Sequence, residues 1–425
     1  MARAADVSVV WPPGTGWRRP ATLLEKGAQG SKMVMPRWRV EAVVLAAMLS
    51  ACSVADEGTP AAAPTSLSSS AQAAGSSVWP ASPATDLLIE SRSGLQGEID
   101  RWVSKGLVPG VTAAVVTPEG VWSGAAGVDG RGTPLVPESG MALASITKTF
   151  TAAEVMLLSE RGRVDLDAPA STYIDVPQVA NGVTIRQLLA QRSGVAESRE
   201  AGLGDRNGVW STAKYLTYVP PATAKPGVAF AYDNTNYVLL GMVIERVSGR
   251  SVGDALKADL WDPLGIRRLA YQDAQRLPPP LARPPAQATA EPELDRCVGE
   301  GPVLPCRALA TLFGAAGGAA GDVEAVARWG YELYGSRLLR PESVDQLTDF
   351  QDGDGYGLGT IDIRALENGR WDFDAVGHTG ETVGYRSVLV TIPGAKVSVA
   401  ILTPSTVEVL PLVKRLAAAG SLLQQ

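Results

Sequence analysis

Apolar residues along the chain repeat with two different periods, and these periods predict a helix followed by strands. Between residues 86 and 105 the apolar spacing is helical. Two short β-branched runs follow at 111–116 and 121–126, with the turn residues Pro118-Glu119-Gly120 between them. A helix followed by an antiparallel hairpin is typical of an α+β fold rather than of a repeated βαβ unit. The residues expected to anchor the helix are Leu87, Leu88, Ile89, Leu95, Ile99 and Val103.

The centre of the chain, from about residue 150 to 310, has mainly helical patterns and loops, and it predicts a helical subdomain inserted between strands. Within it, residues 183–189 predict a short helix that Thr184 caps and that ends at Ser193-Gly194. Two β-branched runs flanked by Gly and Pro, at 385–392 and 397–403, predict late strands. If these strands pair with the early hairpin, the first and last parts of the chain form one sheet.

The N-terminal residues have the layout of an export signal. Arg37 and Arg39 supply positive charge ahead of an apolar run from Ala42 to Leu49, which is too short to span a membrane permanently. The run ends in Leu49-Ser50-Ala51-Cys52, which resembles the lipobox of bacterial lipoproteins, where the cysteine becomes the lipidated first residue. We therefore expect residues 1–52 to be an export segment and Cys52 to carry a lipid anchor. The alternative is an ordinary cleaved signal with a chance cysteine.

These features predict localisation on the outer face of the bacterial cytoplasmic membrane, or secretion. Because 32 residues precede Met33, we expect translation to start at Met33 or Met35, which leaves residues 1–34 untranslated. Residues 53–85 are rich in Ala, Ser, Pro and Thr and lack hydrophobic periodicity, so they predict a disordered linker. The folded domain is expected over residues 86–415.

The composition excludes several classes of function. With 425 residues the chain is long enough for one large domain or two closely packed ones. Its formal charge of −6 and the absence of a basic stripe make nucleic acid an unsuitable partner. The single histidine, His378, excludes a multi-histidine metal site, and we expect neither a metal nor a cofactor. The sequence contains no Walker or G-x-G-x-x-G motif.

Cys297 and Cys306 lie in a Pro-rich region with weak patterning. In an oxidising compartment this pair predicts a disulfide that closes a loop, and the alternative is two unpaired thiols. With no histidine nearby, we do not expect the two cysteines to bind zinc.

The first candidate for chemistry is the pair Ser145 and Lys148. Three residues span about one helical turn, so both side chains lie on one face of a helix predicted to run to Arg161. The hydroxyl then lies near a helix N-terminus, where free N–H groups favour a developing negative charge. A serine is a weak nucleophile until a base takes its proton, and a lysine is that base only when its surroundings keep it neutral. S-x-x-K alone is common on surface helices, so the prediction depends on partner motifs.

A second segment can supply a proton relay. Tyr232 and Asn234 lie two residues apart just before a predicted helix over 238–247, so a short loop can direct both side chains the same way. A tyrosine beside a lysine ammonium ionises more easily, and it can pass the proton taken from Ser145 to a leaving group. The alternative is a structural tyrosine whose hydroxyl is satisfied in the core.

A third segment can bind a substrate carbonyl. Residues 377–381 precede the strand predicted at 385–392, and a strand edge beside a helix N-terminus can offer backbone N–H groups as an oxyanion hole. Gly380 allows the substrate to approach the backbone closely. The alternative is an ordinary turn.

Together, Ser145-x-x-Lys148, Tyr232-x-Asn234 and His378-Thr379-Gly380 resemble the three motifs of the penicillin-recognising serine hydrolases, in order and in approximate separation. This family includes class C β-lactamases, D-alanyl-D-alanine carboxypeptidases and related esterases. The resemblance covers roughly residues 90–410, and three ordered motifs are specific where each alone is not. Connecting segments that also resemble the family are 166–169, 183–189 with Ser193-Gly194, 236–241, 263–265, Ala316-Gly317-Gly318 and Tyr356-Gly357-Leu358-Gly359.

The resemblance implies an α+β fold of the β-lactamase/transpeptidase type, in which an antiparallel sheet flanked by helices meets an all-α subdomain at the active site. It implies that Ser145 is the acylated nucleophile and that Lys148 is the base that activates it. Tyr232 is then expected to relay protons, and Asn234 to position Lys148 and the substrate amide.

The same resemblance implies that His378 and Thr379 hold the carboxylate side of the substrate, and that the N–H groups of Ser145 and Glu381 form the oxyanion hole. Class C β-lactamases typically have a lysine where this chain has His378, and a histidine is a weaker anion anchor at neutral pH. Asp233 replaces the usual small serine and adds a negative charge that disfavours anionic substrates. Residues 191–194, Gln-Arg-Ser-Gly, stand where a His-Thr-Ser-Gly-like sequence is common.

We therefore expect an exported, monomeric serine hydrolase that forms an acyl-enzyme and acts like a D-alanyl-D-alanine carboxypeptidase on a small peptide. One alternative is a β-lactamase or a carboxylic-ester hydrolase of the same fold, with a β-lactam or an ester as its substrate. Another alternative is a non-catalytic penicillin-binding or sensor protein that keeps the fold. The rate at which water frees the acyl group separates these hypotheses, and the sequence does not determine it.

Overall fold

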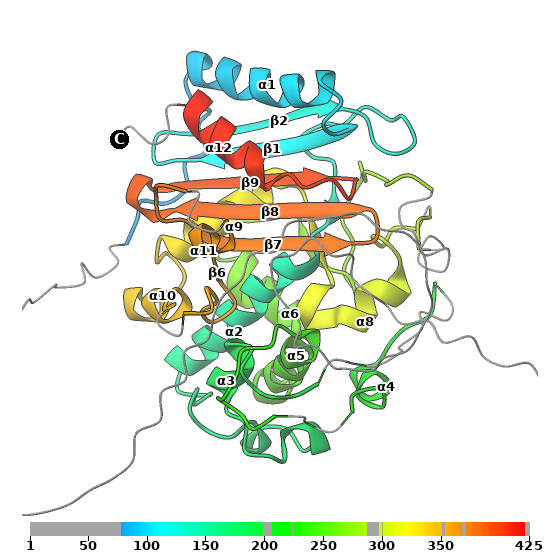
Figure 1. Ribbon diagram of the computed structural model, residues 1–425, viewed down its shortest axis with the longest axis vertical. Helices are drawn as coiled ribbons and strands as arrows, with labels where there is room; N and C mark the ends of the chain where they lie inside the picture. Colours follow the sequence, from blue (N-terminus) through cyan, green and yellow to red (C-terminus); the bar gives the residue numbers. More distant parts are fainter. Residues whose placement is uncertain are drawn as a thin grey trace, which may run out of the picture. The chain divides into compact units, whose positions relative to one another are not determined.

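Strands from both ends of the chain form one antiparallel sheet (Figure 1). The computed structural model describes residues 78–196, 198, 206–220, 222, 224–286, 297–299, 301–350, 353–367 and 371–420. Within these residues the sheet has the strand order β2-β1-β9-β8-β7-β6. β1 pairs with β9 in the register Ala114↔Ala400, which confirms that the early hairpin joins the late strands. The strands are β1 Gly110–Val116, β2 Val121–Gly127, β6 Ile361–Asp362, β7 Val376–Thr382, β8 Tyr385–Ile392 and β9 Val397–Thr403.

Helices cover both faces of this sheet, because successive side chains of its strands are apolar and point to opposite faces. Helices α1 (Ile89–Ser104) and α12 (Leu410–Ala419) pack together on one face (Figure 1), in a cluster that includes Val115 of β1. Val116, the next residue, belongs to the cluster on the other face, which α9 (Val323–Tyr334) covers. The sheet is therefore the middle layer of the domain.

The opening helix matches its predicted position but not all of its predicted anchors. Leu95, Ile99 and Trp102 are buried, whereas Leu88 and Ile89 are 76% and 75% exposed. At about 100° per residue, Ile89 lies about 240° around the helix from Leu95 and faces away from the sheet. The prediction that these two residues anchor the helix was wrong, because the helix begins only at Ile89.

The helical region predicted for residues 150–310 is present in the described chain, with one short strand inside it. This strand, β4 (Leu269–Tyr271), pairs with β5 (Ala319–Gly321), which also pairs with β3 (Met141–Ala142). Thr184 caps its short helix as predicted, in a reciprocal capping box with Gln187. The remaining α-helices are α2 Thr147–Glu160, α3 Ile185–Leu189, α4 Thr212–Leu216, α5 Asn234–Ser248, α6 Val252–Ala255, α8 Arg307–Gly317, α10 Pro341–Leu347 and α11 Ile363–Leu366. Short segments of other helix types are η1 Ala144–Ile146, η2 Ala170–Thr172, η3 Pro177–Val179, η4 Leu256–Trp261 and η5 Pro393–Ala395.

The folded domain begins earlier than residue 86. Trp79 is buried, packs edge-on against the ring of Tyr331 at 5.1 Å, and donates its backbone N–H to the carbonyl oxygen of Gly335. Ser82 donates its N–H to the Glu332 carboxylate at 2.8 Å. The predicted linker boundary at residue 85 was therefore wrong, because an aromatic side chain just before it finds a site on α9. Cys52, the predicted export segment and the rest of the predicted linker lie outside the described residues.

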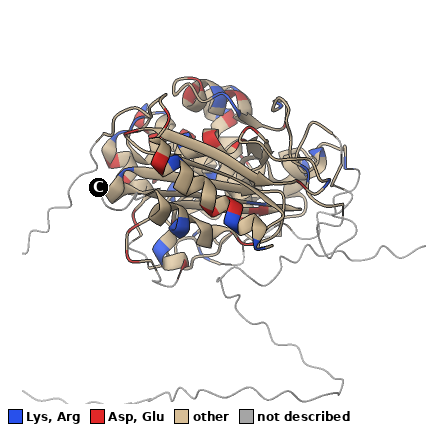
Figure 2. Cartoon of the chain, turned by 90° about the horizontal axis from the view of Figure 1, so that it is seen from above, with Lys and Arg blue, Asp and Glu red and all other residues tan. Residues whose placement is uncertain are grey.

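The surface of the described domain carries charges of both signs. Figure 2 shows Lys and Arg interspersed with Asp and Glu over the helices visible in that view. Among the described residues, none of the helices combines the length and apolar character that crossing a membrane requires.

Candidate active site

Ser145 lies in a tight turn that leads directly into α2. This turn, η1, follows Leu143, and Ile146 donates its N–H back to the Leu143 carbonyl oxygen at 3.2 Å. Ala144 has a φ of 47°, a conformation that costs energy for any residue with a β-carbon. Its neighbours must impose this conformation, which fixes the direction of the following hydroxyl. Ser145 is half-buried at the start of the helix, as the sequence predicted.

Lys148 is fully buried and its ammonium nitrogen contacts three oxygen atoms. Nζ lies 3.0 Å from Ser145 Oγ, 2.8 Å from Asn234 Oδ1 and 2.9 Å from the carbonyl oxygen of Ala316. A carbonyl and an amide oxygen can only accept hydrogen bonds. When the amine is in its neutral form and donates to these two oxygens, it directs its remaining lone pair toward the serine hydroxyl. The arrangement suits a base that takes the Ser145 proton.

Asn234 and Tyr232 reach this lysine from a different helix. Asn234 is the first residue of α5, whose N-terminus Asp233 caps by accepting from the Thr235 N–H at 2.7 Å. Lys148 Nζ lies 4.8 Å from the centroid of the half-buried Tyr232 ring. The cap and the contact between α2 and α5 thus bring the first two predicted motifs together. Asp233, which the sequence suggested as a charge beside the site, is 5% exposed and serves this cap.

The third motif lies on β7, immediately beside the nucleophile turn. A β-carbon at residue 380 would lie 2.2 Å from the Leu143 carbonyl oxygen and 3.2 Å from the Ser145 backbone nitrogen, so only glycine permits this contact. The same carbonyl accepts from Ser387 Oγ, on β8, at 2.8 Å. These contacts hold the strand and the turn together.

Strand alternation also gives the direction of the Glu381 backbone. The carbonyl of Ala375 accepts from Ile363, which lies on the β6 side of β7. Because every second residue of a strand directs its N–H and C=O to the same edge, Glu381 directs its N–H to that edge, away from β8. The Glu381 carboxylate instead forms an ion pair with Arg386 at 3.0 Å. Its backbone, rather than its side chain, is therefore available to a substrate.

His378 occupies a different environment from the one an anion anchor requires. Its ring is 1% exposed, with Nδ1 2.6 Å from the Thr379 carbonyl oxygen and Nε2 3.3 Å from the Tyr356 hydroxyl. Burial, and then the positive charge of Lys148, lowers the pKa of His378 to about 3. The imidazole is therefore neutral across the physiological range and cannot hold a substrate carboxylate by charge. Thr379 is half-buried on the same strand.

Three further residues complete the site, and the motifs did not assign a role to any of them. Ala316 supplies the carbonyl that anchors Lys148, Tyr356 contacts His378, and Gln191 accepts from the Asp233 N–H at 3.0 Å while fully buried. Ala316 and Tyr356 lie in segments that already resembled the family. A backbone carbonyl leaves no signal in side-chain identity, so the sequence could indicate these segments but not their contacts.

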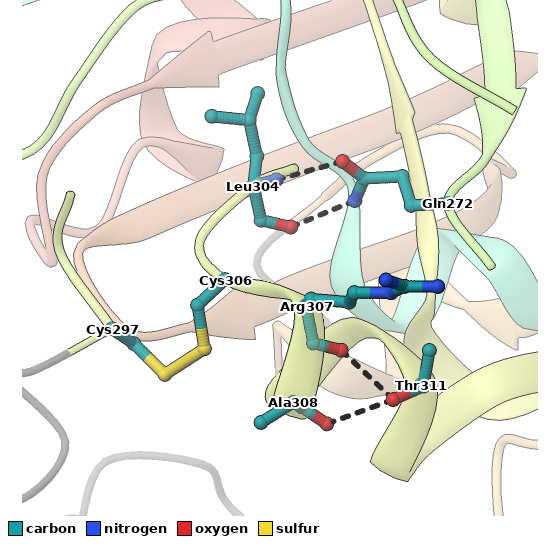
Figure 3. The surroundings of a disulfide bond; sticks show 7 residues. All are labelled: Gln272, Cys297, Leu304, Cys306, Arg307, Ala308 and Thr311. Carbon is teal, nitrogen blue, oxygen red and sulfur yellow. Dashed lines mark hydrogen bonds between the residues drawn. A yellow bond between two sulfur atoms is a disulfide. The ribbon is translucent and has the colours of Figure 1, made fainter. Parts of the chain in front are cut away.

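Cys297 and Cys306 form a disulfide at the entrance to α8 (Figure 3). The loop that they close is held by Gln272, whose side chain bonds both the N–H and the carbonyl of Leu304 at 2.7 Å. α8 then runs to the segment that anchors Lys148. The described residues contain no group of three or more His, Cys, Asp or Glu side chains that could hold a metal ion.

Comparison with known proteins gives one family model and several relatives. The model described as Beta-lactamase matches residues 98–421. Penicillin-binding protein 4 of Amycolatopsis lactamdurans is 28% identical over 332 residues, which cover 70% of this chain and 81% of that protein. A D-stereospecific amidohydrolase structure from Streptomyces sp. has a TM-score of 0.63 and 25% identity, covering 76% of this chain and 97% of its own. The octameric penicillin-binding protein homologue from Pyrococcus abyssi has a TM-score of 0.60 and 25% identity, covering 78% and 77%.

Proposed function

Because this chain belongs to the Beta-lactamase family of serine hydrolases and has that α+β fold, we propose that it cleaves peptide or amide bonds through an acyl-enzyme on Ser145. The observation that carries the proposal is the contact of Lys148 Nζ with Ser145 Oγ at 3.0 Å. Asn234 and the Ala316 carbonyl hold that amine from the other side. A buried amine fixed against a serine hydroxyl is the arrangement that activates the hydroxyl as a nucleophile.

In the proposed reaction, Lys148 takes the proton of Ser145 while Oγ attacks the substrate carbonyl carbon. The backbone N–H groups of Ser145 and Glu381 donate to the oxygen that becomes negative, and the start of α2 adds a favourable dipole. Tyr232 passes the proton to the leaving nitrogen, so the C–N bond breaks without releasing an amide anion. Water then attacks the ester by the same steps in reverse and frees Ser145.

The proposed substrate is a small peptide or amide with a D-amino acid at the cleaved bond. The names of two similar proteins support this class, since one is a penicillin-binding protein and the other a D-stereospecific amidohydrolase. D-alanyl-D-alanine carboxypeptidase activity is the specific form that we propose first. A β-lactamase or carboxylic-ester hydrolase is the second candidate, because the same acyl-enzyme forms on β-lactams and esters.

Intact-mass measurement after incubation with a β-lactam tests the proposal. We expect a mass increase equal to one β-lactam on wild-type protein and none on Ser145→Ala. A lasting adduct supports a carboxypeptidase, whereas rapid loss of the adduct with antibiotic hydrolysis supports a β-lactamase. If Ser145→Ala still forms the adduct or hydrolyses a D-alanyl peptide at the wild-type rate, the proposed nucleophile is wrong. An adduct without turnover of any peptide, amide or ester supports a sensor.

We further propose that the protein is exported and held at the outer face of the cytoplasmic membrane by a lipid on Cys52. Membrane fractionation of Cys52→Ser tests this part separately, and an unchanged membrane-bound fraction contradicts it. We propose a monomer, although the similar penicillin-binding protein homologue from Pyrococcus abyssi is octameric. Sedimentation of the purified protein measures this directly.

A further inference from the structure

Tyr356 lies at the centre of a group of rings beside the candidate site. Its ring is edge-on to Tyr232 at 5.8 Å and to His378 at 5.9 Å, and it is tilted against Phe230 at 5.7 Å. The rings of Tyr232 and His378 are also 6.2 Å apart. These centroid separations fall within the range of favourable aromatic pairs. Tyr356 therefore contacts both the candidate proton relay and the histidine of the third motif.

The segment that carries Tyr356 is fixed in place. Gly357 donates its N–H to the Thr360 carbonyl at 2.9 Å, and Leu358 donates to the Leu347 carbonyl at 3.1 Å. Gly359 has a φ of 77°, and a β-carbon there would lie 3.2 Å from the Lys148 carbonyl oxygen. The segment thus presses against α2 beside the catalytic lysine, so the position of the Tyr356 ring is defined relative to Lys148.

The hydroxyl of Tyr356 also contacts the imidazole of His378. The Thr379 carbonyl can only accept, so His378 Nδ1 carries a proton and donates to it at 2.6 Å. In the neutral ring Nε2 is then an acceptor that faces the Tyr356 hydroxyl at 3.3 Å, and this hydroxyl also hydrogen-bonds Tyr237 and Gln191. The titratable groups around this imidazole are Lys148, Tyr232 and Tyr356. The positive charge of Lys148 and the Tyr356 donor both favour the neutral ring.

Tyr232 needs this support because its relay function depends on the direction of its hydroxyl. Lys148 Nζ lies 4.8 Å from the centroid of the Tyr232 ring. The other described neighbours of this ring are Tyr356 and His378. Two rotatable side-chain bonds allow the ring to turn unless its neighbours prevent it. Removing a neighbour therefore changes the chemistry without touching the nucleophile.

We propose that Tyr356 is a positioning residue that holds the Tyr232 ring beside Lys148, directly through its own ring and indirectly through the His378 imidazole. This role rests on the proposed function, because Tyr232 is taken as the proton relay of the acylation step. Among its described contacts, Tyr356 itself touches no reacting atom.

Two substitutions separate the hydroxyl from the ring. Tyr356→Phe removes the donor to His378 and keeps the ring, whereas Tyr356→Leu removes both. Tyr385→Phe is the matched control, because Tyr385 is also a buried tyrosine and its hydroxyl donates to the Ala282 carbonyl at 2.9 Å, outside residues 356–360. We expect Tyr356→Leu to slow acylation on the order of 100-fold, as a displacement of about 1 Å does. Tyr356→Phe should slow it about tenfold, through loss of one hydrogen bond, with KM little changed in both.

A second measurement is independent of activity. The chain has a single histidine, so untagged protein gives one imidazole signal in an NMR pH titration. We expect the wild-type and Tyr385→Phe signals to titrate alike, and the Tyr356→Phe signal to titrate at higher pH, because the neutral ring has lost its donor. Circular dichroism of each variant shows whether it is folded.

Each outcome decides a separate point. A folded Tyr356→Phe with the wild-type histidine titration overturns the contact through His378. Wild-type acylation rates in both Tyr356 variants overturn the positioning role, and if Tyr356→Leu does not fold, the Tyr356→Phe rate decides alone. If wild-type protein never acylates at Ser145, the proposed function fails and this role fails with it, whereas the titration still reports on the contact.

Discussion

Replacing Glu154 by Gln should stabilise the protein at neutral and alkaline pH. Glu154 lies in the middle of α2, and its side chain is fully buried. Burial, and then the negative charge of Asp259, raises the pKa of this carboxyl from 4.5 to about 7. Arg161 and Arg250 oppose the shift without cancelling it. The folded protein therefore favours the uncharged form of this side chain.

The sign and size of the effect follow from this shift. A carboxyl whose pKa is higher in the folded state binds more protons when folded, so its contribution to stability is present below pH 4.5 and is lost as pH rises through about 7. The rise of this pKa from 4.5 to about 7 corresponds to about 3 kcal/mol of unfolding free energy. A glutamine side chain has nearly the same shape as glutamate and does not ionise, so the Glu154→Gln variant avoids this loss.

Urea unfolding of wild-type protein and Glu154→Gln at pH 5 and pH 8 measures the difference. We expect the variant to exceed the wild type by about 1 kcal/mol at pH 5 and by about 3 kcal/mol at pH 8. Glu90→Gln, at an exposed position in the first turn of α1, is the control and should change little at either pH. A difference between Glu154→Gln and wild type that stays constant from pH 5 to pH 8 would refute the argument, since a packing effect has no reason to follow ionisation.

Further substitutions test the site and the cross-link. Lys148→Ala should lower the acylation rate by roughly 10²–10⁴-fold, as loss of a general base does, in stopped-flow measurements with a chromogenic substrate; an unchanged rate would exclude Lys148 as the base. Gly380→Ala should lower kcat on the order of 100-fold, because the new methyl displaces β7 from the Leu143 carbonyl, and an unaltered kcat would contradict this close contact. Cys297→Ser should lower the free energy of unfolding by about 2.5 kcal/mol, which is the chain-entropy value for so short a loop. Calorimetry of the wild type with and without reductant measures the same contribution, and equal stability in the two conditions would contradict the prediction.

The pattern of the sequence predicted most of the framework, because local spacing determines it. The hairpin, both late strands and the capped helix at Thr184 were predicted from period, turn residues and capping residues, and the structure has them. The predictions of burial and of the domain boundary were wrong where contacts between residues distant in the sequence outweigh the local hydrophobic pattern. Trp79 lies in a segment of linker-like composition but packs on α9, and Ile89 fits a helical stripe but faces solvent.

For the site, the sequence by itself determined which residue types are present and in what order: a serine and a lysine one turn apart, a tyrosine and an asparagine before a second helix, and a glycine ahead of a late strand. Only the tertiary structure decided what each of them contacts. The Ala316 carbonyl on Lys148 and the Tyr356 hydroxyl on His378 come from segments 168 and 22 residues away along the chain. The neutral state of His378 was likewise decided by the fold, because the pKa of an imidazole depends on burial and on neighbouring charge, and neither is a property of the residue alone.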